Sequence, residues 1–224
     1  MHILNRSKAV AVGILFLFSI NFSFADAARI SIGRLKYQGG DWYSNPSSLP
    51  NLLQRFALVT RSKIETREQT VSFADSTWRK VPVIYFTGHK GFQLSESERD
   101  NLREFLTNGG FLFADDNFGM DKNIRTELNS LFPGSRLQEL PFSHTIFQAP
   151  YQIKNGVPKI HEHYGGAPKA LGLFYRGRMV AFYAFNTDLG DGWEDLEVHG
   201  DGPVKHESAL RMGVNVLHYA LLGE

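Results

Sequence analysis

Apolar and polar residues follow several patterns along the chain, and these patterns predict strands alternating with helices. Residues 29–37 alternate with a period of two, which predicts a first strand. The short apolar runs at 81–87 and 111–114 are typical of strands buried on both faces. An extended segment near 64–73 and a strand at 136–140 complete this part of the pattern.

Helices are predicted between and after these strands. Residues 49–61 carry apolar side chains at helical spacing. Ser95 and Glu98 form a capping-box pattern, so a helix should begin there and run to a Gly-Gly pair that ends it. Residues 121–131 and 206–222 have the pattern of two further helices.

A late β-hairpin is predicted from residues 171–175 and 179–185, which flank a short polar turn. Strands that alternate with helices favour an α/β fold with a mostly parallel sheet, and the hairpin predicts an antiparallel edge. Residues 28–224 are short enough to share one hydrophobic core, so we expect a single domain.

The first 27 residues have the three parts of a secretory signal peptide. Arg6 and Lys8 precede an apolar run at 9–20, and cleavage is expected after Ala25 or Ala27. An uncleaved anchor is the alternative, but it needs an apolar run nearer about 20 residues. We therefore expect a periplasmic or secreted protein, and no later run is long and apolar enough to span a membrane.

The amino-acid composition excludes several classes of binding partner and of catalytic chemistry. The formal net charge is +1 and no basic block is present, which argues against a nucleic-acid partner. The chain has no cysteine, which excludes disulfides, thiol nucleophiles and cysteine-ligated metals. There is also no G-x-S-x-G elbow for a serine nucleophile and no phosphate-binding glycine loop.

Unusual polar residues gather where strands of the predicted sheet end. Ligands of parallel α/β sheets bind outside the carboxyl ends of the strands. This rule selects the loop after Tyr37, residues 87–89, residues 115–119 and the segment after Phe185. We therefore predict a polar cleft at that edge.

Asp115, Asp116 and Asn117 follow one buried strand directly. Two adjacent carboxylates could bind a metal or share a proton, one raising the pKa of the other. Asp and Asn also cap helices, so a purely structural role is the alternative. We take Asp115 and Asp116 as candidate catalytic residues and Asn117 as a candidate ligand contact.

His161 and His163 lie in a loop bounded by proline and glycine. Alternate side chains of an extended segment point the same way, so both imidazoles could reach one divalent metal or one anion. Zinc needs a third protein ligand, for which His89, His199 and Asp115 are candidates. A solvated loop without metal is the alternative. His89, His161 and His163 are also candidate catalytic residues.

Two further loops offer candidate ligand contacts. Residues 187–199 are acidic and glycine-rich, but their spacing does not fit an EF-hand. Trp193 within them could pack in the core or stack on a ligand. The loop after the first strand combines glycines with flat aromatic faces suited to a sugar. The candidate contacts from both loops are Gly40, Asp41, Trp42, Tyr43, Asp191, Trp193 and Glu194.

Long segments of the chain resemble a bacterial family of exported or membrane-anchored proteins that is known only as a domain of unknown function. The segments are LKYQGGDWYSNPSSLPNLL, LSESERDNLREFLTNGGFLFADDNFGMD, PKIHEHYGG and TDLGDGWEDLEVH. That family is similar to proteins of the class I glutamine amidotransferase-like, flavodoxin-like fold, so the resemblance implies a three-layer α/β sandwich. Where amidotransferases carry their cysteine, this chain has Asp115, Asp116 and Asn117, so it implies no glutaminase chemistry.

Two functions remain open from the residues alone. The leading hypothesis is an exported domain that binds a small polar ligand, carbohydrate or cell-envelope material in a polar cleft. The alternative is a hydrolase in which Asp115 or Asp116 works with histidines, with or without a divalent metal. No cofactor is assured by the sequence.

Overall fold

The computed structural model describes residues 29–163 and 165–223, which are built around one seven-stranded sheet. The order of the strands across the sheet is β2-β1-β3-β4-β7-β6-β5. The predicted signal peptide lies outside the described residues. The strands are β1 (Ile32–Leu35), β2 (Gln69–Val71), β3 (Val83–Phe86), β4 (Phe111–Asp115), β5 (Gln138–Glu139), β6 (Lys169–Tyr175) and β7 (Arg178–Phe185).

Five neighbouring strands of the sheet are parallel, and the remaining two pairings are antiparallel. β2, β1, β3, β4 and β7 pair in parallel, whereas β6 pairs antiparallel with both β7 and β5. This confirms the predicted mostly parallel sheet and its late hairpin. The hairpin lies one strand inside the edge, however, because the short β5 pairs with the outer side of β6.

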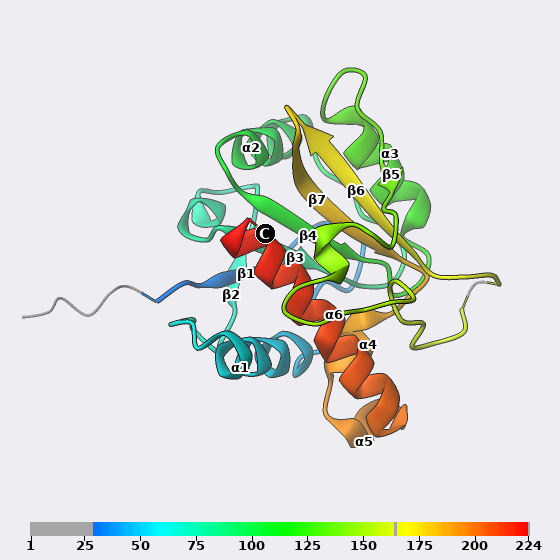
Figure 1. Ribbon diagram of the computed structural model, residues 1–224. Helices are drawn as coiled ribbons and strands as arrows, with labels where there is room; N and C mark the ends of the chain where they lie inside the picture. The colour runs from blue at the N-terminus through cyan, green and yellow to red at the C-terminus, as the bar shows by residue number, and fades with distance from the viewer. Residues whose placement is uncertain (1–28, 164, 224) are drawn as a thin grey trace, which may run out of the picture.

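Helices cover both faces of this sheet, and Figure 1 shows the long α6 crossing one face with α1 beside it. Residues of α1, α4 and α6 join one hydrophobic cluster, and residues of α2 and α3 join a second cluster on the other face. The helices are α1 (Ser48–Thr60), α2 (Glu96–Thr107), α3 (Asp121–Ser130), α4 (Leu189–Trp193), α5 (Leu196–His199) and α6 (Gly202–Leu222), with 3₁₀ turns η1 (Thr77–Lys80) and η2 (Thr145–Phe147).

The central strands are buried on both faces, as their apolar runs predicted. Side chains of a strand alternate between its two faces. In β4, Phe113 therefore packs into the cluster with α1 and α6, while Leu112 and Ala114 pack into the cluster with α2 and α3. The same alternation continues beyond the apolar part of β4 and decides which way each acidic residue at its end points.

Sequence patterns predicted the structure accurately where the contacts involved lie within a few residues of one another. Ser95 caps α2, and the reciprocal hydrogen bond from Glu98 completes the predicted capping box. The segment near 64–73 is a strand only at β2, with Ile64 forming an isolated bridge to Ile30. The stretch 187–199, predicted as a loop, instead contains the short helices α4 and α5.

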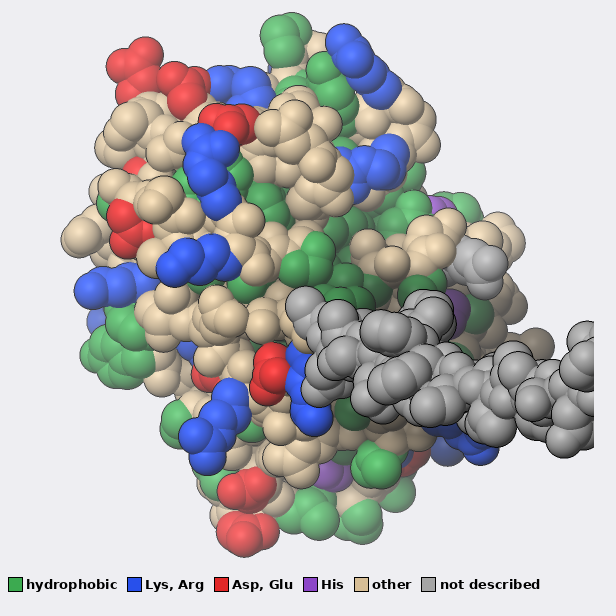
Figure 2. Space-filling model, turned by 90° about the vertical axis from the view of Figure 1, so that its left-hand side faces the viewer, with side chains coloured by type: hydrophobic (Ala, Val, Ile, Leu, Met, Phe, Trp, Pro, Cys, Tyr) green, Lys and Arg blue, Asp and Glu red, His purple; other side chains and the backbone are tan. Residues whose placement is uncertain are grey.

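The surface carries mixed charge, and no helix of the described residues is both long and apolar enough to cross a membrane. Figure 2 shows basic and acidic side chains interspersed on the face in view, with apolar side chains between them.

Candidate metal centre

The carboxyl ends of β1, β3, β4 and β7 meet at one edge of the sheet, and the polar residues predicted for this edge contact one another there. Nδ1 of His89, after β3, lies 2.9 Å from Oδ2 of Asp41, after β1. Nε2 of the same imidazole lies 3.3 Å from Nδ2 of Asn117, after β4. Asn117 itself is buried. The edge therefore holds a connected polar network rather than separate loops.

Asp115 points to the face of the sheet covered by α1, α4 and α6. Its carboxylate is buried and accepts hydrogen bonds from the backbone N–H groups of Leu189 (3.2 Å) and Gly190 (2.7 Å) at the start of α4. The hydroxyl of Thr187 donates a third hydrogen bond, at 3.3 Å. Burial raises the pKa of Asp115 to about 7 despite these bonds. Asp115 thus holds the first turn of α4 against the end of β4.

Asp116 points to the opposite face. Its Oδ1 accepts the backbone N–H of Met120 at the start of α3, and its Oδ2 accepts the hydroxyl of Tyr183 at 3.3 Å. Asp115 and Asp116 therefore do not share one site, although adjacent carboxylates suggested it, because adjacent residues of a strand project to opposite faces. Asp115 contacts Thr187, Leu189 and Gly190, on either side of Asp188.

His161 and His163 come close to each other, with ring centroids 5.7 Å apart, and both reach acidic residues around α4. Nε2 of His163 lies 2.8 Å from Oδ2 of Asp188. Nδ1 of His161 lies 2.9 Å from Oδ2 of Asp191 and 3.7 Å from Oδ2 of Asp188. Nδ1 of His199 lies 3.8 Å from the same oxygen of Asp191. These five residues form the histidine–aspartate cluster.

The spacing within the histidine–aspartate cluster fits a divalent metal. His161, His163 and Asp188 each offer one donor atom, and these atoms lie within 4.8 Å of one another. His161, Asp191 and His199 form a second such group that shares His161. Ligand atoms about 2.0–2.2 Å from zinc in a tetrahedral site are about 3.4 Å apart, so the distances above need only small adjustments.

Asp188 is the residue of the cluster that is hardest to explain without an ion. Its side chain is 2% exposed, and Oδ1 has no hydrogen-bond partner within the described part of the chain. Burial, together with the charges of Asp115 and Asp191, raises the pKa of Asp188 to about 10. Its backbone has φ 56°, a left-handed conformation that costs energy for a residue other than glycine. Such strain and unpaired burial are typical of functional positions.

Two of the imidazoles are oriented by a second layer of carboxylates. Nε2 of His161 lies 3.0 Å from Oδ2 of Asp201, and Nε2 of His199 lies 3.0 Å from Oε2 of Glu194. In both rings this leaves Nδ1 directed at Asp191. Metal-binding histidines usually donate their other ring N–H to a carboxylate, which fixes the tautomer and makes the ligand more basic.

A cavity of about 500 Å³ adjoins the cluster and is lined by the loops after β1, β3 and β4. Gly40, Asp41, His89, Lys90 and Phe118 are among its walls. The ring of Phe118 also contacts the ring of His163, with centroids 5.0 Å apart. Phe118 therefore separates this cavity from His163 and connects its wall to the histidine–aspartate cluster.

The other predicted ligand contacts are placed differently. Trp42 packs partly against the core cluster that contains α2 and α3, and Tyr43 is exposed. Trp193 is fully buried, so its indole ring is a core group and has no face open to a ligand. Glu194 is buried behind His199 and acts through that ring.

Asp188 and Asp201 were not predicted as partners of the histidines. Asp188 follows the end of β7 by three positions, so the rule on strand ends could have selected it. Asp201 lies 40 residues from His161, and no local pattern connects the two.

Neutralising Asp115 and Asp116 separately should distinguish the two faces of β4. Asp115→Asn presents an amide to the N–H groups that position α4, so we expect the Kd for zinc to rise about 10–100-fold, the usual cost of losing an outer partner. Asp116→Asn keeps an oxygen for Met120 and should change that Kd less than about threefold. Competition with a chromophoric chelator measures both, and equal effects would contradict the assignment.

The sheet and its edge define an α/β protein with a candidate metal site at the carboxyl ends of parallel strands. The chain belongs to the family described as Domain of unknown function (DUF4159), which matches residues 31–221. No curated protein matches the chain.

Proposed function

We propose that this chain is a divalent-metal-dependent hydrolase that acts on a small polar ligand, carbohydrate or cell-envelope material. The observation that carries the proposal is the buried carboxylate of Asp188, which faces two imidazoles and has one oxygen without a hydrogen-bond donor among the described residues. A buried charge of this kind is stable when it is paired or coordinates a metal.

The residues of the cluster have separate tasks in this proposal. His161, His163 and Asp188 would hold the ion. Asp191 and His199 would add further ligands, or replace His163 and Asp188 as the ligands beside His161. A divalent ion supplies Lewis acidity and lowers the pKa of water for attack. Asp115 fixes the start of α4 and so keeps Asp188 in place.

A ligand-binding domain without catalysis is the second candidate, and it was the leading hypothesis from the residues alone. The cavity beside the cluster favours it, because Gly40, Asp41 and His89 offer polar contacts without a metal. The two candidates differ in one outcome: a binding domain would retain its ligand unchanged, whereas a hydrolase would release products when loaded with metal.

The test starts from protein purified without chelators or a histidine tag. Equilibrium dialysis against zinc, followed by elemental analysis, should give about one ion per chain, as a mononuclear histidine–carboxylate site predicts. The double variant His161→Ala/His163→Ala should retain no zinc above background. Zinc-loaded wild-type protein should hydrolyse p-nitrophenyl acetate faster than the chelated protein.

A matched histidine variant controls for loss of structure. His144 lies outside the cluster, and its ring accepts the N–H of Ile146 at the start of η2. His144→Asn keeps an acceptor at that position and should bind zinc as the wild type does. Unchanged zinc retention in the His161/His163 variant would refute the metal site, and zinc binding without any hydrolysis would favour the binding domain.

The finer fold assignment is also a proposal. The strand order β2-β1-β3-β4-β7 corresponds to the order of the flavodoxin-like doubly wound fold, with β7 in the fifth position. This supports the class I glutamine amidotransferase-like sandwich that the sequence resembles. With Asp115 and Asp116 where a cysteine would stand, thiol chemistry is absent from the proposal.

Export to the periplasm or the medium stays a prediction from residues 1–27. Replacing Leu15 and Leu17 with aspartate breaks the apolar run, so full-length precursor should accumulate in the cytoplasm. Cell fractionation with immunoblotting measures this, and the conservative pair Leu15→Ile/Leu17→Ile is the control. Mature-sized variant in the periplasm would contradict export by this segment. The net charge and the interspersed surface charges support a partner other than nucleic acid.

A further inference from the structure

The pair formed by His89 and Asp41 is a second group of titratable residues at the edge of the sheet, outside the histidine–aspartate cluster. The side chain of His89 is 42% exposed and lines the cavity of about 500 Å³. Asp41 binds this residue twice: one carboxylate oxygen accepts the backbone N–H of His89, and Oδ2 lies 2.9 Å from Nδ1 of the ring. The imidazole is thus held rigidly while one edge stays accessible.

The backbone around this pair is built for close approach. Gly88 has φ 149°, and a Cβ placed there would lie 2.9 Å from a carboxylate oxygen of Asp41 and 2.3 Å from the hydroxyl of Tyr37. A Cβ on Gly40 would meet the carbonyl oxygens of His89 and Gly91 at 2.9 Å. Only glycine lets the loops after β1 and β3 approach so closely, and this approach brings Asp41 to the ring.

The hydrogen bonds define the tautomer of His89. Nδ2 of Asn117 is a donor, and its 3.3 Å contact with Nε2 requires a lone pair on that nitrogen. Nδ1 then carries the proton and donates it to Asp41. Although partial burial would raise the pKa of Asp41, hydrogen bonds from the backbone and the ring of His89 hold it below its usual range, so Asp41 is a charged acceptor.

Phe118 connects the pair to the histidine–aspartate cluster. Phe118 follows Asn117 directly, and its ring packs against the ring of His163. The backbone N–H of Lys90, next to His89, donates to the carbonyl of Phe118 at 2.9 Å. The cavity therefore has His89 on one wall and a residue that contacts a metal ligand on another. The cavity lies at the carboxyl ends of β1 and β3, where the strand order reverses direction and where doubly wound sheets bind ligands.

We propose that His89 is the general base for hydrolysis of an ester or amide bound in this cavity, and that Asp41 is its positioning residue. The inference rests on the proposed metal-dependent hydrolase. Water adds to the carbonyl carbon while its proton passes to Nε2 of His89, which gives up its contact with Nδ2 of Asn117 in this step. The bond from that carbon to oxygen or nitrogen then breaks, and the proton is delivered to the leaving alcohol or amine. The products are a carboxylic acid and that alcohol or amine.

We prefer a carbonyl substrate to a phosphodiester because of the number of metal ions that the histidine–aspartate cluster can hold. Phosphodiesters are commonly cleaved between two metals about 3.5–4 Å apart. Among the described residues the two possible donor groups share His161, and Asp201 holds Nε2 of that ring, so its Nδ1 can bind one ion at a time. One ion with a histidine base suits an acyl substrate, as in mononuclear zinc hydrolases.

The kinetic test uses zinc-loaded full-length mature protein with p-nitrophenyl acetate and bis-p-nitrophenyl phosphate as probes. His89→Gln should lower kcat for the acetate about 10²–10⁴-fold, the usual contribution of a general base, with KM and zinc affinity changed less than about threefold. Asp41→Asn should also lower kcat for the acetate. His144→Asn is the control and should retain full activity. Wild-type activity in His89→Gln, or faster cleavage of the phosphodiester, would overturn the inference.

A second readout is independent of activity. Side-chain ¹⁵N NMR of the wild type should show His89 as the Nδ1–H tautomer, and Asp41→Asn should shift the signals toward a mixture of tautomers. A wild-type Nε2–H tautomer would overturn the positioning role. Failure of zinc to bind refutes the proposed function in its own assay, whereas normal zinc binding with a full-speed His89→Gln variant refutes only this inference.

Discussion

Replacing Asp188 with asparagine is expected to weaken zinc binding by more than about 100-fold, beyond the usual cost of losing an outer partner, because it removes a direct ligand. In the metal-free protein the same change should raise the free energy of unfolding by at least about 1 kcal/mol, because the amide replaces a carboxyl group whose pKa burial shifts upward, and one pKa unit corresponds to about 1.4 kcal/mol. The opposite signs arise because the buried carboxylate destabilises the fold until an ion occupies it.

The pH dependence of this effect has a defined sign. The pKa of Asp188 is raised to about 10 in the folded protein, whereas an unfolded aspartate titrates near about 3.9. Between these values the folded state binds a proton that the unfolded state has lost, so the stability of the metal-free protein falls as pH rises. Asp188→Asn should remove this contribution to the slope.

Thermal melts with chelator or with zinc, at pH 5, 7 and 9, measure both effects. Asp195→Asn is the matched control: it removes the same charge from the same segment, where the carboxylate accepts a hydrogen bond from Asn51 and faces no histidine of the cluster. The control should keep the zinc-dependent gain in Tm. A metal-free Asp188→Asn protein less stable than the wild type, with its zinc response intact, would remove Asp188 from the site.

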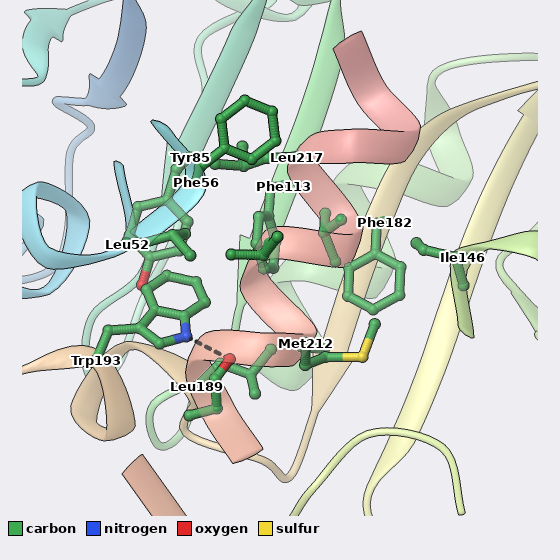
Figure 3. Packing of buried hydrophobic residues seen from close by; sticks show 14 of the residues in the cluster. Leu52, Phe56, Tyr85, Phe113, Ile146, Phe182, Leu189, Trp193, Met212 and Leu217 are labelled. Carbon is green, nitrogen blue, oxygen red and sulfur yellow. Dashed lines mark hydrogen bonds between the residues drawn. The ribbon is translucent and has the colours of Figure 1, made fainter. Parts of the chain in front are cut away.

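Trp193→Ala is expected to cost about 3–5 kcal/mol in the free energy of unfolding, as for other large core aromatics. The indole is fully buried between Tyr85 and Phe113, with ring centroids 5.3 and 5.5 Å away. Its N–H donates to the carbonyl oxygen of Ala209 at 2.8 Å (Figure 3). Truncation leaves a cavity and removes this hydrogen bond.

Urea unfolding measures this loss, and Tyr43→Ala is the control. Tyr43 was a candidate ligand contact of the same chemical type but is 66% exposed, so its removal should change stability by less than about 0.5 kcal/mol. Zinc affinity should also fall in Trp193→Ala, because Trp193 anchors α4 between Asp191 and Glu194. Substitutions at the surface usually change the free energy of unfolding by less than about 0.5 kcal/mol. A decrease below about 1 kcal/mol in Trp193→Ala would therefore contradict a role in the core.

Helices and strands whose formation depends on residues close in sequence were predictable. The capping box at Ser95 and Glu98 needs only contacts within one turn, and the apolar runs of β3 and β4 needed only the chemistry of their own side chains. The helix at α4 was not predictable in this way. Its first N–H groups are held by Asp115, 74 positions away from Leu189, and the segment itself is short and rich in glycine.

Asp115 and Asp116 show what a local pattern can and cannot decide. Their place at the end of a buried strand was predicted, and period-two alternation sends them to opposite faces. Which of the two faces carries α4, and hence which carboxylate adjoins the histidines, depends on how the chain crosses the sheet after β7. The packing of α4 against α1 and α6, with its first N–H groups on Asp115, settled that question.

The sequence by itself determined the central strands and the longer helices, the edge of the sheet where polar residues gather, and the absence of thiol chemistry, because these depend on residue type and short-range spacing. Only the tertiary structure decided the donor set. His161 and His163 face Asp188 and Asp191 because β7 lies beside β4 and a left-handed residue turns the chain into α4. Ligands so far apart in sequence are brought together by packing of the whole sheet, which no local pattern encodes.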